Sequence, residues 1–346
     1  MAAQNKGTIL ITGGGGFVGG QIIREALESG FSVRLTARSA SSAARTVARF
    51  PAFASALSTA IVPDMTAPEA YESAFADGAA ITHVVHAASP FNLAPRDNVR
   101  DLLDPAVRGA TSVLEAALRY GGGKVKRVVA TSSFAAVIDL SKGLREGYSY
   151  DEKDWNPVTW DEAAVAPGVV AYCASKALAE RAMWDWMEEH KDEVSFGLAT
   201  ICPPWVFGPY AHELRDTKGL SESVQLLNGI IDGDAIPAFD FGGYADSREV
   251  AAAHVRALQV PEAEGKRFVV GQDFRYQAAV DIAREEEPEL ARRMPVGKMG
   301  EWIPAYHIDG SLATRVLGLK YGSLRDTVMD TYRQLLKARE AEVAAA

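Results

Sequence analysis

The sequence predicts an α/β protein with a doubly wound, mostly parallel β-sheet and a smaller C-terminal α/β lobe. From the N-terminus to about residue 203, short β-branched runs alternate with amphipathic helical stretches. Strands that alternate with helices form βαβ units, whose parallel sheet is covered by helices on both faces. Residues 81–86 and 127–131 are continuous runs of strand-forming residues, which is typical of strands buried on both sides. The alternation breaks after residue 203, where prolines bracket a turn.

The apolar spacing of each segment assigns it to a strand or a helix. Strands are predicted at residues 8–12, 32–37, 58–62, 81–86, 127–131 and 196–202, with helices at 17–29, 102–119 and 169–189. Beyond the prolines, helices are predicted at 221–231, 247–258, 278–284 and from 323 to about 339, and a strand at 267–270. We divide the chain into a first domain, residues 1–203 with late sheet elements from about 240–275, and a second lobe, residues 204–346.

Composition and charge exclude several classes of function. Apolar residues make up 48% of the chain and charged residues 23%, and the net charge of -9 argues against a nucleic-acid partner. Cys173 and Cys202 form no CxxC motif and are expected to be free thiols of a reducing compartment. The histidines lack metal-ligand spacing, so we expect no metal site. The N-terminal segment has no long apolar run, and we expect a cytoplasmic protein without membrane contact.

A glycine-rich turn follows the first predicted strand. Gly13, Gly16 and Gly19 have the G-x-x-G-x-x-G spacing, and Phe17 and Val18 open the next helix. Such glycines allow a tight turn, a close approach of the backbone to a pyrophosphate and tight packing of the helix. The phosphate would lie on the amide groups at the positive end of that helix. A glycine run can be an ordinary turn, but its place in a βαβ unit makes the first domain a Rossmann-type dinucleotide-binding domain. We expect the second lobe to be mainly substrate-binding.

The residues after the second and third strands bear on the choice of cofactor. An acidic residue after the second strand would bind the ribose 2′-hydroxyl of NAD, whereas an arginine accommodates the 2′-phosphate of NADP. Arg38 stands there and offers a planar fork of donors, so NADP(H) is expected; a solvated surface arginine is the alternative. After the third strand, Asp64 can accept from the adenine amino group with Met65 beside the ring. A helix N-cap is an equally good interpretation of Asp64.

A candidate catalytic group combines a tyrosine, a lysine and a serine. Tyr172 and Lys176 are four residues apart on a predicted helix, so their side chains share one face. A neighbouring ammonium stabilises the phenolate and lowers the tyrosine pKa, so Tyr172 is predicted to act as a general acid near neutral pH. Ser132 and Ser133 close the preceding strand, where open α/β sheets bind ligands. We choose Ser133 to hold the substrate carbonyl; Ser132 would serve the turn, and the two could exchange roles.

In this order and at these spacings, the glycines, Arg38, the serine pair, Tyr172 and Lys176 resemble the extended short-chain dehydrogenase/reductase family. Further segments resemble its dihydroflavonol-reductase-like branch, and within it the fungal NADPH-dependent methylglyoxal and isovaleraldehyde reductases and carbonyl reductases. These segments are HAASPF at 86–91, TSSFAAV at 131–137, WNP at 155–157, AYCASK at 171–176, VFGP at 206–209, FGGY at 241–244 and IP at 303–304.

The resemblance implies that Ser133, Tyr172 and Lys176 act together and that hydride comes from the nicotinamide of NADP(H). Lys176 would also bond the nicotinamide ribose. The resemblance also implies that further residues contact the cofactor: Phe17, Val18, Ala87, Ala88, Tyr172, Lys176, Pro203, Val206 and Ser223.

Three aromatic residues that follow strand ends are candidates for the substrate pocket. Phe91, Phe134 and Trp205 would form apolar walls, with core packing as the alternative for each. The chain departs from the fungal relatives at Ser42, where they usually have a lysine, so Arg38, helped by Arg45, would carry the 2′-phosphate. Trp205 stands where smaller or phenolic residues are usual, so the shape of the pocket does not transfer.

The predicted activity is the NADPH-dependent reduction of an aldehyde or ketone to an alcohol, with an apolar small-molecule carbonyl substrate. An NADP-dependent alcohol or hydroxysteroid-type dehydrogenase uses the same residues oxidatively and stays open. A nucleotide-sugar epimerase or dehydratase usually has an acid after the second strand, which counts against it here. A non-enzymatic NADP sensor typically lacks the tyrosine–lysine pair. Both a monomer and a homodimer are compatible with the sequence.

Overall fold

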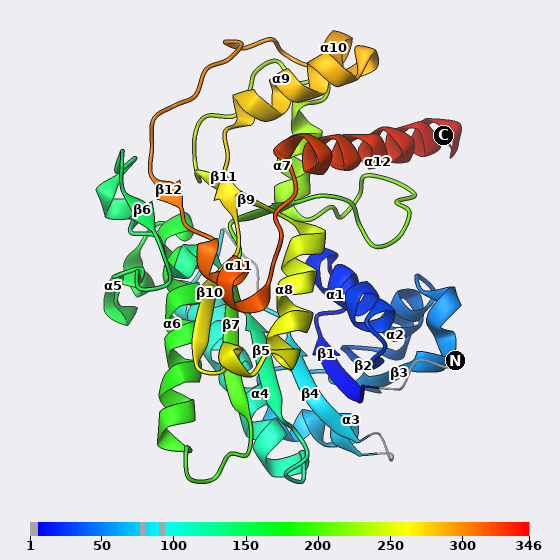
Figure 1. Ribbon diagram of the computed structural model, residues 1–346, viewed down its shortest axis with the longest axis vertical. Helices are drawn as coiled ribbons and strands as arrows, with labels where there is room; N and C mark the ends of the chain where they lie inside the picture. Colours follow the sequence, from blue (N-terminus) through cyan, green and yellow to red (C-terminus); the bar gives the residue numbers. More distant parts are fainter. Residues whose placement is uncertain (1–5, 77–79, 90–93, 346) are drawn as a thin grey trace.

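A seven-stranded parallel sheet forms the centre of the protein (Figure 1). The structure, a computed structural model, describes residues 6–76, 80–89 and 94–345. The strands are β1 (Thr8–Thr12), β2 (Ser32–Ala37), β3 (Leu57–Ile61), β4 (Ile81–His86), β5 (Arg127–Thr131), β7 (Gly197–Cys202) and β10 (Lys266–Val269). They lie in the order β10-β7-β5-β4-β1-β2-β3. This order confirms the predicted doubly wound fold, because the chain crosses over to both sides of β1.

Helices cover both faces of this sheet. The helices that pack on it or on its edge are α1 (Phe17–Glu28), α2 (Ala40–Val47), α3 (Glu72–Phe75), α4 (Asp104–Tyr120), α6 (Gly168–Glu189) and α8 (Ser247–Gln259). α1 packs against α8, and α4 packs against α6. Along β1, Ile9 and Ile11 join one hydrophobic core and Leu10 joins the other, since successive side chains of a strand point to opposite faces. The central strands are therefore buried on both sides, as predicted.

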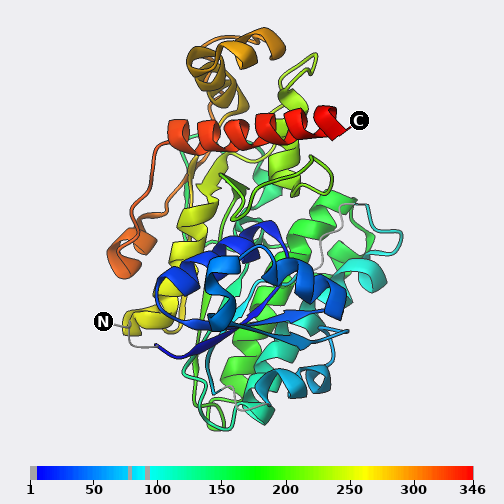
Figure 2. The same cartoon turned by 90° about the vertical axis from the view of Figure 1, so that its right-hand side faces the viewer.

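A smaller lobe of short strands and helices lies beyond the carboxyl ends of the sheet (Figures 1 and 2). Its strands form a three-stranded sheet of order β11-β9-β8 and a two-stranded sheet of β12 and β6. The strands are β6 (Ser149–Tyr150), β8 (Trp205–Phe207), β9 (Gly243–Asp246), β11 (Gln272–Asp273) and β12 (His307–Ile308). The helices of this lobe are α7 (Glu222–Ile230), α9 (Tyr276–Glu286), α10 (Pro288–Arg293) and α12 (Leu324–Ala345). α5 (Trp160–Val165) packs on α6, and α11 (Ser311–Leu317) packs against α8 and the edge strand β10. Figure 2 shows α12 crossing the lobe, with α9 and α10 beyond it.

The chain returns to the central sheet after it has entered the lobe. Residues from about 240–275 were expected to add late elements to the central sheet. Within this range β10 does so by pairing with β7, whereas β9 belongs to the three-stranded sheet. α8 lies against α1 and so covers the central sheet. The strands β6, β8, β9, β11 and β12 have two to four residues each and escaped the sequence analysis. Runs this short show no periodicity, and their pairing partners are remote in the chain.

Candidate active site

A cavity of about 1570 Å³ lies at the carboxyl ends of the central strands. It is bounded by the turn after β1, the residues that follow β4, β5 and β7, one side of α6 and the segment that leads from β8 to α7. Open α/β sheets bind ligands at this edge. The predicted site residues that line the cavity are Gly13, Gly16, Phe17, Val18, Gly19, Ala87, Ser133, Phe134, Tyr172, Lys176, Pro203, Trp205, Val206 and Ser223.

Other predicted cofactor residues do not line this cavity. Arg38 is exposed directly after β2. The Asp64 carboxylate accepts hydrogen bonds from the backbone nitrogen and the hydroxyl of Thr66, both at 2.8 Å, so it caps a turn. Met65 packs against the core beneath α4, and the backbone nitrogen of Ala88 donates to the Thr12 hydroxyl at 3.1 Å. The predicted pocket residue Phe91 lies outside the described residues.

The glycine turn is a cradle that side chains would fill. Gly13 has a φ of +71°, in the left-handed region that favours glycine, and a Cβ there would lie 2.6 Å from the backbone of Ala87 and Ala88. A Cβ on Gly19 would overlap the carbonyl oxygen of Gly13. The strand end after β4 and the start of α1 therefore both touch the turn directly. This close packing leaves backbone amides, rather than side chains, at the N-terminus of α1, as a pyrophosphate requires.

Basic side chains gather beside the glycine turn. Arg24 of α1, Arg45 of α2, Arg49 and His212 all line the cavity. Nη1 of Arg49 donates to the carbonyl oxygen of Gly15 at 2.8 Å. Burial lowers the pKa of His212 to about 4, with further lowering by Arg49 and Arg24, so this histidine is neutral at pH 7. The arginines make this end of the cavity favourable for an anionic group such as a phosphate.

Arg49 is a candidate cofactor residue that the sequence analysis missed. It lies four residues after Arg45, in the turn two residues beyond the end of α2. The signal in the sequence was that a further arginine follows Arg38 and Arg45 in the segment after the second strand. Its contact with Gly15 depends on how α2 packs against the glycine turn, which local spacing does not determine.

The two serines after β5 have different surroundings. The Ser132 hydroxyl donates to the Glu180 carboxylate at 2.6 Å. The Ser133 hydroxyl accepts from the backbone nitrogen of Ala135 at 3.1 Å, and its own proton is not used in that contact. Both serines line the cavity. The Ser133 hydroxyl can still donate to a carbonyl oxygen, which supports the choice of Ser133 over Ser132.

Tyr172 and Lys176 lie together on α6, with the Lys176 Nζ 5.0 Å from the centre of the Tyr172 ring. Lys176 is buried, and its Nζ donates to the hydroxyl of Ser89 at 2.6 Å. Ser89 is exposed after β4 and also lines the cavity, so it is a further site residue that the sequence analysis did not single out. The hydrogen bond holds the ammonium on the side of the cavity where the β4 segment ends.

The predicted net lowering of the Tyr172 pKa is wrong for this structure. Burial raises the pKa of the Tyr172 phenol above its ordinary value, with smaller contributions from Cys173 and Glu222. Burial also lowers the pKa of the Lys176 ammonium to about 8. Both shifts have one cause, because loss of water disfavours the charged form of each group. A raised pKa keeps the phenol protonated at neutral pH, which is the state that a proton donor needs.

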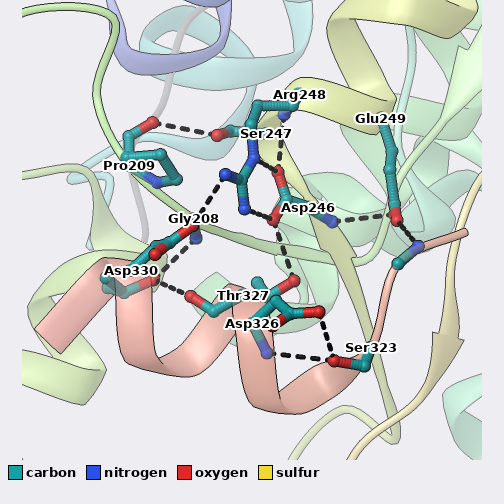
Figure 3. A network of polar contacts seen from close by, with 12 residues as sticks. Gly208, Pro209, Asp246, Ser247, Arg248, Glu249, Ser323, Asp326, Thr327 and Asp330 are labelled. Atoms are coloured by element: carbon teal, nitrogen blue, oxygen red, sulfur yellow. Dashed lines mark hydrogen bonds and ion pairs between the residues drawn. The ribbon is translucent and has the colours of Figure 1, made fainter.

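The turn between β8 and the following loop is fixed by α8 and α12 (Figure 3). Gly208 has a φ of +101°, and its backbone nitrogen donates to the Thr331 hydroxyl at 2.7 Å. The Ser247 hydroxyl donates to the carbonyl oxygen of Pro209 at 2.9 Å. Asp246 accepts from Arg248 and from Thr327 of α12, which ties the two helices together. The backbone nitrogen of the nearby Val206 donates to the Ser223 hydroxyl at 3.3 Å. Ser223, a predicted cofactor residue, therefore holds the backbone of β8.

Aromatic residues form one wall of the cavity. The Trp205 ring meets Phe241 edge-on at 5.4 Å, and its Nε1 donates to the Asp240 carboxylate at 3.2 Å. Phe241 also lines the cavity and was not predicted. Phe134 is almost fully buried in a core cluster with Tyr150 and Tyr306, so core packing accounts for most of its surface.

The fold and the site together define a dinucleotide-binding enzyme, with a glycine cradle and a tyrosine–lysine pair in one cavity. The chain belongs to the NAD dependent epimerase/dehydratase family, whose model matches residues 9–271. The predicted resemblance to extended short-chain dehydrogenases/reductases is thereby confirmed.

Particular relatives are similar over nearly the whole chain. The NADPH-dependent methylglyoxal reductase GRE2 of Saccharomyces cerevisiae is 37% identical over 344 residues, which cover 95% of this chain and 98% of the relative. The ketoreductase azaE of Aspergillus niger is 35% identical over 338 residues, with coverages of 95% and 97%. The crystal structure of yeast methylglyoxal/isovaleraldehyde reductase Gre2 complexed with NADPH has a TM-score of 0.87 at 36% identity, with coverages of 95% and 98%.

Proposed function

We propose that this protein reduces an aldehyde or ketone to an alcohol with NADPH. The observation that carries the proposal is that Ser133, Tyr172 and Lys176 line the same cavity as the glycine cradle. The similar proteins named as an NADPH-dependent methylglyoxal reductase and a ketoreductase support the same reaction. We therefore favour the reductase over the epimerase, the sensor and the oxidative dehydrogenase.

The residues of the cavity fit a dinucleotide, because a Cβ at Gly13 or Gly19 would fill the cradle in which a pyrophosphate would lie. Gly13, Gly16 and Gly19, with the amides at the start of α1, would hold the phosphates. When bound, the nicotinamide supplies the hydride. Ser133 donates a hydrogen bond to the substrate carbonyl oxygen, and Tyr172 gives that oxygen its phenolic proton. Lys176 supplies positive charge beside the phenol, which stabilises the phenolate once the proton has left.

Positive charge near the adenosine end would favour NADPH over NADH. Arg38 stands at the end of β2, where the 2′-phosphate is recognised in this fold. Arg45 and Arg49 line the cavity beside the glycine turn and add to the charge. The turn formed by Asp64 and Met65 remains our proposed adenine site, and the backbone at Ala87, Ala88, Pro203 and Val206 our proposed lining of the cofactor.

We further propose an apolar carbonyl compound as the substrate, held between Trp205, Phe134 and Phe91. Residues 1–203, with late sheet elements from about 240–275, would form the dinucleotide-binding domain, and residues 204–346 would be mainly the substrate-binding lobe. Trp205 and Phe241 support this proposal by the apolar wall that they form. The cytoplasmic location and the monomeric or homodimeric state stay predictions. Cys173 and Cys202 are both free and buried, as expected of thiols in a reducing compartment. None of the described helices has the length and apolarity needed to cross a bilayer.

The first experiment measures consumption of NADPH and of NADH by absorbance, with a panel of apolar aldehydes, ketones and diketones and with charged carbonyl compounds for comparison. We expect the apolar compounds to be reduced, at a much higher rate with NADPH than with NADH. When Arg45 and Arg49 are both changed to serine, the ratio of the NADPH rate to the NADH rate should decrease. A clear preference for NADH would contradict the cofactor proposal. NADPH binding without turnover of any panel member would contradict the reaction.

The pH dependence of kcat/KM for NADPH should report Lys176. This parameter follows ionisations of the free enzyme. The Lys176 pKa of about 8 means that the ammonium is charged below that pH and loses its charge as the pH rises through it. We therefore expect kcat/KM to fall above about pH 8. In Lys176→Arg, whose guanidinium stays charged, the fall should move to higher pH although the rate is lower overall. A profile that is identical in the two proteins would assign the fall to another group.

A further inference from the structure

Glu180 is a buried carboxylate on the same helix face as the candidate catalytic pair. Its side chain is 1% exposed, and it follows Lys176 by four residues and Tyr172 by eight along α6. Residues at this spacing lie one above another on a helix. No step of the proposed reaction uses this carboxylate, so its burial beside the site needs another explanation.

Groups from three strand segments converge on Glu180. The Ser132 hydroxyl, after β5, donates to it at 2.6 Å, and the Thr200 hydroxyl of β7 donates at 2.6 Å. Nε and Nη2 of Arg267, from β10, donate at 2.7 and 3.1 Å. The carboxylate therefore joins α6 to the ends of neighbouring strands of the central sheet.

Glu180 is held in its ionised form. Burial acts to raise its pKa, but attraction to Arg267 and the hydrogen bonds from Arg267, Ser132 and Thr200 outweigh burial, so the pKa lies below its usual range. Ionised carboxylates only accept hydrogen bonds, so the proton of the Ser132 hydroxyl is directed to Glu180. This proton is thus withheld from a substrate in the cavity.

The direction of Ser132 constrains the next residue. Ser133 has an extended backbone, with φ of −159° and ψ of 153°. Successive side chains of an extended chain point to opposite sides. With Ser132 held against α6, the neighbouring hydroxyl of Ser133 is turned away from Glu180, where it can meet a carbonyl oxygen.

We propose that Glu180 is a positioning residue that fixes Ser133 relative to Tyr172 by acting through Ser132. The proposal rests on the reductase function, since it assigns Ser133 to the substrate carbonyl. The helix α6 then positions both groups that contact the substrate oxygen. It carries the proton donor Tyr172, and through Glu180 it holds the end of β5, which carries the Ser133 hydroxyl. A change of about 1 Å in such a geometry can cost about 100-fold in rate.

The test compares Ser132→Ala with Thr200→Val, because each removes one 2.6 Å hydrogen bond to the same carboxylate. Glu180 itself is not changed, because its removal would leave the buried guanidinium of Arg267 without its ion-pair partner. We expect kcat to fall about tenfold in Ser132→Ala and to stay within about twofold in Thr200→Val. KM for NADPH should be unchanged in both proteins. The primary isotope effect with deuterated NADPH should increase only in Ser132→Ala, because hydride transfer becomes slower there. Ser132→Thr, which keeps the hydroxyl, should restore kcat.

Equal kcat values in the two variants would overturn the positioning role and leave Glu180 as a structural ion pair only. Crystal structures of both variants give a readout that does not depend on turnover. We expect the Ser133 hydroxyl to be displaced from Tyr172 in Ser132→Ala and not in Thr200→Val. An undisplaced Ser133 in both would also overturn the proposal. A wild-type protein that reduces no carbonyl compound would contradict the proposed function, and the structural comparison would still decide the positioning role.

Discussion

Changing Tyr172 to phenylalanine should lower kcat for carbonyl reduction by about 10²- to 10⁴-fold, the usual contribution of a positioned general acid. The substitution removes only the hydroxyl, and the ring stays beside the Lys176 ammonium. The alkoxide that forms as hydride arrives would then have no phenolic proton to take. NADPH consumption with the fastest panel substrate is the measurement.

Two controls separate loss of chemistry from loss of structure. Tyr148→Phe removes a hydroxyl that donates to Asp154 at 2.6 Å, and Tyr148 does not line the cavity, so its kcat should stay near that of the wild type. NADPH binding by Tyr172→Phe, followed by fluorescence, should remain within a few-fold of the wild type. Turnover by Tyr172→Phe within tenfold of the wild type would contradict the assignment of Tyr172 as the proton donor.

Changing Gly19 to alanine should weaken NADPH binding by about 100-fold or more. The added methyl group would overlap the carbonyl oxygen of Gly13, so either α1 or the glycine turn must move. A displaced turn no longer presents its amides to the pyrophosphate, and loss of two hydrogen bonds to a charged group, at about 1.5 kcal/mol each, corresponds to about 100-fold in Kd. The measurement is the NADPH Kd, determined by fluorescence titration.

The matched control is Gly20→Ala, on the next residue of the same helix. A Cβ there would have Ala211 as its nearest neighbour at 3.8 Å, an ordinary contact. Replacing a helix-interior glycine with alanine also favours the helix by about 1 kcal/mol. We expect Gly20→Ala to bind NADPH normally and to melt at the wild-type temperature or above. Equal NADPH affinities for the two variants would show that the cradle tolerates a side chain and would contradict the proposed pyrophosphate site.

The parts of this protein that the sequence predicted are those that depend on neighbours in the chain. Strand β1, the glycine turn and α1 follow one another directly, so apolar spacing and three glycines were sufficient to predict them. Tyr172 and Lys176 share a face because helix geometry alone places residues four apart together. The alternation of strands and helices along the chain likewise predicted a doubly wound parallel sheet, whereas the order of its strands was seen only in the structure.

The parts that only the tertiary structure decided depend on residues far apart in the chain. Glu180 reaches Ser132 across 48 positions, and Arg267 reaches Glu180 across 87. That network, which distinguishes Ser132 from Ser133, has no local periodicity to reveal it. The raised pKa of Tyr172 was mispredicted for a related reason: spacing gives the distance to a neighbouring ammonium, but burial is produced by the whole fold around the phenol. The sequence by itself thus determined which chemical groups lie together on one turn or one helix face. Tertiary packing decided how each group is oriented, whether it is charged and whether it is buried.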